Sequence, residues 1–308
     1  MALEKLDNSN ISVHLGKTSE YKSQYDPSLL VREPRSNNRK HLNIDDDNLP
    51  FIGYDTWNAY EISALTDNGL PVVGVAKIVY PASSKFIVES KSLKLYFNSF
   101  NMTKLGVTPD EVRDNIRSRS EKDLSKLLET PVFVNVNSNS EVLLEFNTTF
   151  AEYHEGFITI EDEFENELTG EFTVYQETPE LLKFEEFPEG ENVIRKYHSA
   201  LLKSNCRVTS QPDWGDVYIV YKSSKDIDPV SLVKYIVSFR DECHFHEEIC
   251  ETIYKRLHDA LQPELLHVMC LYARRGGIDI NPQRASSDQY LHGVVENTVF
   301  CHIKTPKQ

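Results

Sequence analysis

Cys206 is the residue in this sequence whose surroundings best suit a nucleophile. A cysteine attacks as its thiolate, which nearby cations favour, and Lys203 and Arg207 lie on either side of it. Asp213 follows beyond Pro212, so a turn could bring its carboxylate back toward the sulfur, where it could relay protons. The alternative is a buried, unreactive thiol, which is the more common fate of a free cysteine. The local sequence leaves both interpretations open.

Two later segments carry groups that could bind a polar ligand or move protons. His246 could act as an acid or a base because an ordinary imidazole changes charge near neutral pH. Glu247 could accept two hydrogen bonds from a guanine-like edge. Arg275 and Gly276 lie in an Arg-Arg-Gly-Gly run, where the backbone could approach a phosphate and arginine could balance its charge. A solvated helix face and a basic turn are the simpler interpretations.

A third segment, Glu-Ser-Lys-Ser-Leu-Lys-Leu-Tyr at positions 89–96, places charges and hydroxyls close together after the apolar run 86–88. By itself it is typical of a solvated strand end, or of a sheet edge protected by lysine. A ligand-binding segment is the alternative.

Other site types find little support in the sequence. Cys243, His244 and His246 could suggest a metal, but no second ligand pair has the spacing of a zinc finger, so we expect no metal. No G-x-G-x-x-G follows a strand, and no Walker loop occurs, so a Rossmann dinucleotide site is not indicated. The four cysteines other than Cys206 lie near apolar residues, and we expect them to be buried and inert: Cys243, Cys250, Cys270 and Cys301.

The elements that must position these residues follow a similar order in both halves. In the first half we expect strands within 62–97, a helix capped by Thr108 with Pro109 and Glu111 in its first turn, a strand at 132–136 and a hairpin partner at 142–146. In the second half we expect a strand at 217–221, a long helical region over about 229–261 and a strand at 265–272.

This order predicts an α+β protein of two related modules. Residues 1–45 are polar and form an irregular lead-in, and residues 46–160 form the first module. Residues 161–191, rich in acid and containing two prolines, form a linker region, and residues 192–308 form the module with Cys206.

Composition excludes some partners. The chain of 308 residues has a formal net charge of −15, which disfavours direct binding to nucleic acid because phosphates are neutralised by lysine and arginine. No stretch approaches the roughly 20 apolar residues that span a bilayer. The polar start lacks the apolar core of a signal peptide, so we expect a cytoplasmic protein with no membrane partner.

Together, these segments resemble one family, the NADPH-dependent 7-cyano-7-deazaguanine reductases (QueF), in the long two-module form. The matching segments lie in the family's order along nearly the whole chain: 15–17, 53–57, 89–96 with 98–101, 204–206 with 211–215, 245–247, and 274–277 with 281–282. Arg207 departs from the apolar residue usual at that place, and the acidic linker region is individual to this chain.

The resemblance implies a fold, a cofactor and a set of site residues. The fold would be two tandem tunnelling-fold modules, each an antiparallel sheet with helices packed on one face, with active sites between modules and a homodimeric assembly. The cofactor would be NADPH and the substrate a small deazapurine, with no metal. The implied site residues are Cys206, Asp213 and His246 for catalysis; Val88, Glu89, Ser90, His246 and Glu247 for the substrate; and Ser90, Lys91, Arg275 and Gly276 for the cofactor.

The implied chemistry is a four-electron reduction. Cys206 would attack the nitrile carbon to form a thioimide, Asp213 would relay protons, and hydride from NADPH would lead in two stages to the amine. His246 would be the second proton donor. A thiol-dependent nitrile or amide hydrolase, and a non-catalytic protein that binds a purine-like ligand, are the alternative functions.

Overall fold

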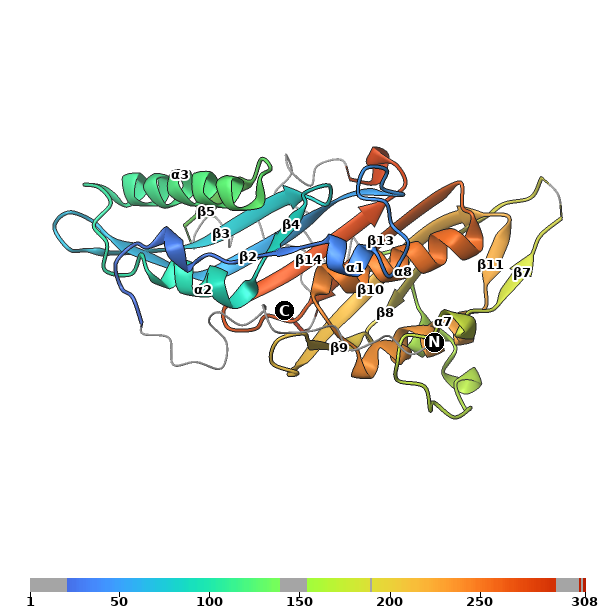
Figure 1. Ribbon diagram of the computed structural model, residues 1–308. Coiled ribbons are helices and arrows are strands. Elements are labelled where there is room, and N and C mark those ends of the chain that lie inside the picture. Colours follow the sequence, from blue (N-terminus) through green and yellow to red (C-terminus); the bar gives the residue numbers. More distant parts are fainter. Residues whose placement is uncertain (1–20, 139–153, 189, 292–304, 306) are drawn as a thin grey trace.

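The computed structural model describes residues 21–138, 154–188, 190–291, 305 and 307–308. Its main feature is a sheet of ten strands, mostly antiparallel, that runs through both halves of the chain (Figure 1). The order along the sheet is β12-β9-β10-β13-β14-β2-β3-β5, and β8 and β6 continue from β10. These strands are β2 (Ile52–Leu65), β3 (Pro71–Pro81), β5 (Phe133–Asn137), β6 (Ile158–Thr159), β8 (Val193–Ser199), β9 (Lys203–Cys206), β10 (Pro212–Ser223), β12 (Cys243–His244), β13 (Leu265–Tyr272) and β14 (Ile278–Ala285).

The two halves join where β14 pairs antiparallel with β2, from Ile278 opposite Ala59 to Ala285 opposite Ile52. Backbone hydrogen bonds therefore cross continuously from strands of the second half to strands of the first. This junction brings segments more than 200 residues apart in the sequence to neighbouring positions.

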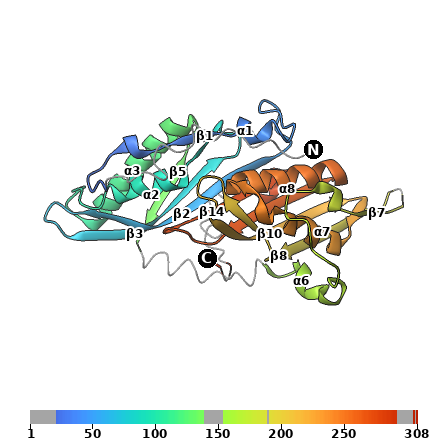
Figure 2. The same ribbon diagram turned by 60° about the horizontal axis from the view of Figure 1, so that its bottom comes forward.

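Helices pack on one face of the sheet, and α2, α3 and α8 lie on the same side in Figure 2. The longer helices are α2 (Ser90–Asn98), α3 (Pro109–Leu128), α7 (Pro229–Val237) and α8 (His246–Leu261). The short elements are α1 (Ser36–Arg39), α6 (Ile160–Glu163), the strand pairs β1 (Arg32–Pro34) with β4 (Phe86–Val88) and β7 (Phe184–Glu186) with β11 (Lys225–Ile227), and the single 3-10 turns η1 (Pro27–Leu29), η2 (Glu165–Glu167), η3 (Pro179–Leu181), η4 (Ser238–Asp241) and η5 (Asp288–Tyr290).

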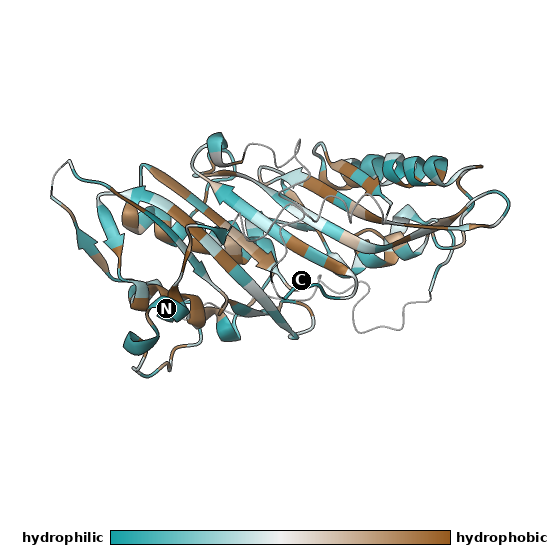
Figure 3. Ribbon diagram, turned by 180° about the vertical axis from the view of Figure 1, so that it is seen from behind, coloured by the Kyte–Doolittle hydropathy of each residue, from teal (hydrophilic) through white to brown (hydrophobic). Residues whose placement is uncertain are grey.

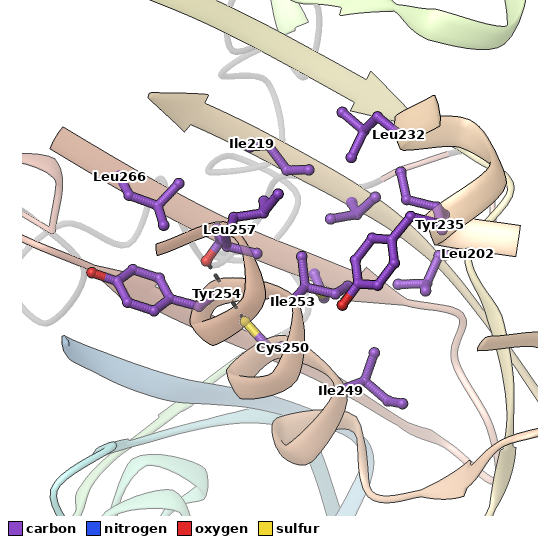
Figure 4. Packing of buried hydrophobic residues seen from close by; sticks show 14 of the residues in the cluster. Leu202, Ile219, Leu232, Tyr235, Ile249, Cys250, Ile253, Tyr254, Leu257 and Leu266 are labelled. Carbon is purple, nitrogen blue, oxygen red and sulfur yellow. Dashed lines mark hydrogen bonds between the residues drawn. The ribbon is translucent and has the colours of Figure 1, made fainter. Parts of the chain in front are cut away.

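Two hydrophobic clusters fill the space between helices and sheet. The larger one places Ile249, Ile253 and Leu257 of α8 against β10 and β13, where Ile219 and Leu266 meet them (Figure 4). The other lies under α2 and α3 and takes Ile278 and Ile280 from β14, a strand of the second half. Figure 3 colours the ribbon by hydropathy and shows hydrophilic and hydrophobic residues mixed along the strands. Because Trp57, Ala59, Ile278 and Ile280 belong to the cluster under the helices, alternation along β2 and β14 places the buried Asn58 and Asp279 on the opposite face.

Several elements that were expected from the sequence are present in the structure. Thr108 caps α3 and Glu111 returns the bond, with Thr108 Oγ1 accepting from Glu111 N at 3.2 Å and Glu111 Oε2 accepting from Thr108 N at 3.3 Å. The strand at 265–272 is β13, and the strand at 132–136 is β5 shifted by one residue. The expected hairpin partner at 142–146 lies outside the described residues.

Three expectations were wrong. The segment 89–96 is not a strand end, because α2 begins at Ser90. The helical region expected over 229–261 is two helices, α7 and α8, separated by η4 and β12. The helix is interrupted because β12 lies at the edge of the sheet, where it pairs with β9. The first long strand, β2, begins at Ile52 rather than near Ile62.

Within the described part of the chain, every helix is too short or too polar to cross a membrane.

Candidate active site

One cavity of about 290 Å³ collects the sequence-predicted site residues from both halves of the chain. Its walls come from the starts of α2 and α8, the β9–β10 hairpin, and the turn between β13 and β14. Every site residue that the family resemblance implies lines this cavity: Val88, Glu89, Ser90, Lys91, Cys206, Asp213, His246, Glu247, Arg275 and Gly276. Other residues also line the cavity, although none of them was assigned to the site from the sequence: Trp57, Lys94, Thr209, His244, Phe245, Ala273, Ile278 and Ile280.

The β9–β10 hairpin places Cys206 and Asp213 on one face. Asp213 pairs with Ser204, and side chains alternate along a strand, so Asp213, Ser204 and Cys206 point to the same side. Cys206 N donates to Gln211 O at 2.8 Å, and Ser210 N donates to Cys206 O at 2.9 Å, which closes the loop. Cys206 is partly exposed rather than buried, as a nucleophile requires.

Asp213 is a buried carboxylate between two basic side chains. Arg275 Nη1 donates to Asp213 Oδ1 at 2.5 Å, and His246 Nε2 lies 3.5 Å from Asp213 Oδ2. Burial alone would raise the pKa of Asp213, but the contacts with His246 and Arg275 outweigh it and hold this pKa below its usual value. The Asp213 carboxyl is therefore ionised at neutral pH in the unliganded protein.

His246 opens α8, and its ring stacks on Tyr272 with the centroids 3.8 Å apart. Its Nε2 atom is buried and makes no well-formed hydrogen bond to any residue that the structure describes. The stacking fixes the plane of the imidazole at the cavity wall, with Nε2 facing Asp213 Oδ2.

Glu247 lies deeper and is 2% exposed. Burial first, and then the negative charge of Asp55, raise the pKa of Glu247 to about 8. The Tyr80 hydroxyl donates to Glu247 Oε1 at 3.5 Å, which is a long and weak hydrogen bond. A buried carboxyl with spare hydrogen-bonding capacity suits the polar edge of a base.

Behind Glu247, a buried ionic cluster ties the halves together. Glu251 of α8 accepts from Arg39 Nη2 at 2.8 Å and from Arg284 Nη2 at 2.9 Å, and Arg284 Nη1 lies 2.8 Å from Asp55 Oδ1. The arginines hold the pKa of Glu251 at about 2 although burial acts against the charged form. Arg35 pairs with Asp55 in the same cluster.

Glu89 has a structural role that the sequence did not reveal. Its side chain caps α2, with Oε1 accepting from Lys91 N at 2.9 Å and Oε2 accepting from Ser92 N at 2.6 Å. A carboxylate has about four acceptor sites, so each oxygen can still accept another hydrogen bond. The sequence carried little signal for this role, because the usual N-cap residues are Ser, Thr, Asp and Asn rather than Glu.

The donor set near α2 fits a phosphorylated cofactor such as NADPH. Three basic side chains, those of Lys91, Lys94 and Arg275, line the same cavity and could balance the charge of phosphates. Gly276 and Gly277 have φ of +60° and +79°, and a Cβ at Gly277 would lie 2.5 Å from Glu61 Cδ, so this turn needs glycine.

Arg207 departs from the family pattern, and its positive charge is balanced by the neighbouring carboxylate of Glu248. Its Nη1 donates to Glu248 Oε1 at 2.8 Å, while Glu248 Oε2 accepts from Phe245 N at 3.0 Å and caps α8. His244 lies opposite Cys206 in the β12–β9 pair, between Glu242 and Glu248. Burial lowers the pKa of His244, but these carboxylates raise it to about 9.

The other cysteines fit the expectation in part. Cys250 and Cys270 are buried, whereas Cys243 is exposed because it lies on the edge strand β12, which corrects the expectation for that residue. Cys301 lies outside the described residues. Among the ranges that the structure describes, no three His, Cys, Asp or Glu residues come together as a metal site.

Both halves of the chain match known protein families. Residues 21–136 match the family described as nitrile reductase, 7-cyano-7-deazaguanine-reductase N-term, and residues 212–290 match the family described as QueF-like protein. One solved structure, of the archaeosine synthase QueF-Like in the apo form, is 17% identical and covers 32% of this chain and 95% of that chain. Its TM-score of 0.28 is too low to bear on the fold.

Curated relatives are similar along most of their length. A protein from Dechloromonas aromatica named NADPH-dependent 7-cyano-7-deazaguanine reductase is 43% identical over 278 residues, 89% of this chain and 90% of the relative. A protein of the same name from Legionella pneumophila (strain Lens) is 41% identical over 279 residues, 91% of each. The resemblance seen in the motifs is thus confirmed, and this chain belongs to the family of NADPH-dependent 7-cyano-7-deazaguanine reductases.

Proposed function

We propose that this chain uses NADPH to reduce the nitrile of 7-cyano-7-deazaguanine to the amine of 7-aminomethyl-7-deazaguanine, in queuosine biosynthesis for tRNA modification. The observation that supports this most is the single cavity that joins Cys206, Asp213 and His246 of the second half to Glu89 and the cationic start of α2 from the first. A nucleophile, proton carriers, carboxyls for a base edge and cations for phosphates are the groups that this reaction needs.

Cys206 is the covalent catalyst in this proposal. Its sulfur bonds to the nitrile carbon, and the thiol proton passes to the Asp213 carboxylate and then to the nitrile nitrogen, which gives a neutral thioimide. Two observations favour this route: Asp213 shares a face of the hairpin with Cys206, and Asp213 is held ionised before the substrate binds. Breaking the carbon–sulfur bond between the two reductions returns the Cys206 thiolate.

The remaining residues bind and orient. NADPH supplies the hydride for each reduction, and Ser90, Lys91, Arg275 and Gly276 are the residues to which we assign its phosphates and ribose. His246 is assigned the second proton donation, because it lines the cavity and its Nε2 lies 3.5 Å from Asp213 Oδ2, from which it could be reprotonated.

Recognition of the base is assigned to the carboxyls of Glu89 and Glu247, together with Val88 and Ser90. Glu247 has a pKa of about 8, so a ligand with N–H donors would favour its ionised form on binding. Glu89 keeps acceptor capacity beyond its two capping bonds.

One assay separates this function from hydrolysis and from simple binding. The full chain is mixed with 7-cyano-7-deazaguanine and NADPH, and cofactor absorbance and released ammonia are followed together. We expect cofactor oxidation without ammonia from the wild type and from Cys243→Ala, the matched control at an exposed cysteine outside the cavity. Cys206→Ala should oxidise none. Ammonia without cofactor oxidation would establish a hydrolase, and neither product would leave only binding.

We also propose that the halves are tandem tunnelling-fold modules, 46–160 and 192–308, with 161–191 between them. The repeated order of elements supports this: β2, β3, α2, α3, β5 in the first half and β8, β10, α7, α8, β13 in the second. The assembly we propose is a homodimer that binds no nucleic acid. Light scattering should give twice the mass of the chain, and a single-chain mass would contradict the dimer.

A further inference from the structure

Arg275, which the family resemblance assigns to the cofactor, has a different partner in the structure. Its guanidinium donates from Nη1 to Asp213 Oδ1 at 2.5 Å and from Nη2 to Thr209 Oγ1 at 2.9 Å. One arginine thus bridges the aspartate of the β9–β10 hairpin and the loop between those two strands.

The backbone around Arg275 is fixed independently of any ligand. Arg275 N donates to Ile278 O at 2.8 Å, and Ile278 N donates to Arg275 O at 3.2 Å, which closes a tight turn through Gly276 and Gly277. The Arg275 side chain is 43% exposed, but its guanidinium is held at two points, by Asp213 and by Thr209, and it projects from a closed turn. These contacts orient it toward Asp213 before any ligand binds.

The two oxygens of Asp213 consequently have different surroundings. Oδ1 is occupied by Arg275, whereas Oδ2 faces His246 at 3.5 Å and has no short bond to it. Oδ2 is therefore the oxygen that remains for proton transfer.

Other charged and titratable groups around the cavity must be counted as well. Besides Arg275 and His246, the cavity is lined by Cys206 from β9, His244 from β12, Glu247 from α8, and Glu89, Lys91 and Lys94 at the start of α2. Among the described residues, Arg275 is the permanent cation with a direct hydrogen bond to Asp213. His246 first and then Arg275 lower the pKa of this carboxyl, so removing Arg275 takes away one of its two cationic partners.

We propose that Arg275 is a positioning residue for Asp213: it holds Oδ1 by a hydrogen bond and leaves Oδ2 to accept the thiol proton of Cys206 before the cofactor takes part. This inference rests on the proposed covalent chemistry and adds a role to a residue otherwise assigned to phosphate binding. In the step concerned, the sulfur–carbon bond forms, the sulfur–hydrogen bond breaks, and the proton passes through Oδ2 to the nitrile nitrogen.

The test is the rate of thioimide formation against pH without NADPH. Full-length wild type, Arg275→Gln and Arg275→Lys are mixed with 7-cyano-7-deazaguanine, and the adduct is followed by rapid quenching and intact-protein mass spectrometry. Arg274→Gln is the matched control, because it removes the same charge one residue away, where the guanidinium stacks on Tyr60 at 3.4 Å.

Adduct formation should fall on the acid side as Asp213 becomes protonated. Loss of a cation in contact with a carboxylate raises its pKa by about one unit or more, so the acid-side midpoint of Arg275→Gln should move up by about one pH unit. Below both midpoints this means a roughly tenfold slower reaction. Arg275→Lys should lie between Arg275→Gln and the wild type, and Arg274→Gln should match the wild type.

The outcomes separate the two claims. An unchanged midpoint in Arg275→Gln, with only the KM for NADPH raised, would make Arg275 a cofactor ligand alone and overturn the inference while the proposed function stands. No adduct on the wild type at any pH would overturn the covalent part of the proposed function and the inference with it. Far-ultraviolet circular dichroism checks folding, and Arg275→Met, which removes the charge but keeps an apolar stem, replaces Arg275→Gln if that variant does not fold.

Discussion

Replacing Glu89 by leucine should weaken the protein in two separable ways. The Glu89 carboxylate is 4% exposed and accepts the backbone N–H groups of Lys91 and Ser92 at the start of α2. Leucine accepts neither, and loss of an N-cap costs about 1 kcal/mol, within a range of about 0.5–2 kcal/mol. We therefore expect urea unfolding to show a decrease of about 1–2 kcal/mol in the free energy of unfolding of Glu89→Leu.

The second effect is on the ligand. If Glu89 also accepts from N–H groups of the bound base, leucine leaves those donors buried and unpaired, at a cost of about 1–3 kcal/mol. Because about 1.4 kcal/mol corresponds to a factor of ten, the dissociation constant should rise about tenfold to a hundredfold. Calorimetric titration with 7-cyano-7-deazaguanine measures it directly.

Thr108→Ala separates the two effects. Thr108 caps α3 and does not line the cavity, so its loss should lower stability by about the same 1 kcal/mol with no change in affinity. Equal affinities for the wild type and Glu89→Leu would remove Glu89 from substrate recognition. Equal unfolding free energies for the two proteins would refute the capping role instead.

Three further predictions follow from the buried charges. Asp213→Asn should bind the nitrile but add to it far more slowly, which intact-protein mass spectrometry would show; adduct formation at the wild-type rate would make Asp213 merely structural. Glu251→Gln should lose about 3–5 kcal/mol of unfolding free energy in urea, because Arg39 and Arg284 each lose one of their two carboxylate partners and the buried cluster keeps an uncompensated positive charge; a loss below 1 kcal/mol would contradict this. Glu247 keeps its proton up to a pKa of about 8 when folded but only to its ordinary value when unfolded, so its stabilising effect is complete at acidic pH and lost as pH rises toward 8. Glu247→Gln should flatten that decline in stability, and an unaltered pH profile would argue against the raised pKa.

Local patterns predicted the elements whose cause is local. The capping box at Thr108 and Glu111 needs only four neighbouring residues, and the apolar run 265–272 is a strand buried on both faces, so both could be recognised without tertiary structure. The break between α7 and α8 could not, because it exists to let Cys243 and His244 pair with β9, a contact between distant segments.

The candidate site residues could likewise be named from local sequence motifs, but their meeting in space could not be predicted. The reactive and charged residues of each motif lie close together in the sequence, so they could be named as candidates. They meet in one cavity because β14 pairs with β2 and because Asp213 lies opposite Ser204 in the β9–β10 hairpin, and neither pairing is visible in the sequence. Walls such as Trp57 and Ile280 carry no polar cue and reach the cavity only through that pairing. The partner of Arg275 was equally hidden, since it lies 62 residues away in the sequence.

The central claim is that Cys206 bonds to the nitrile before reduction. Its most direct test is intact-protein mass spectrometry of the wild type mixed with 7-cyano-7-deazaguanine, followed by peptide mapping and then by addition of NADPH. The account predicts one adduct with the mass of the whole nitrile, located on Cys206 and cleared by NADPH as the amine appears. An amine formed at the wild-type rate by Cys206→Ala, or an adduct located on another residue, would contradict it.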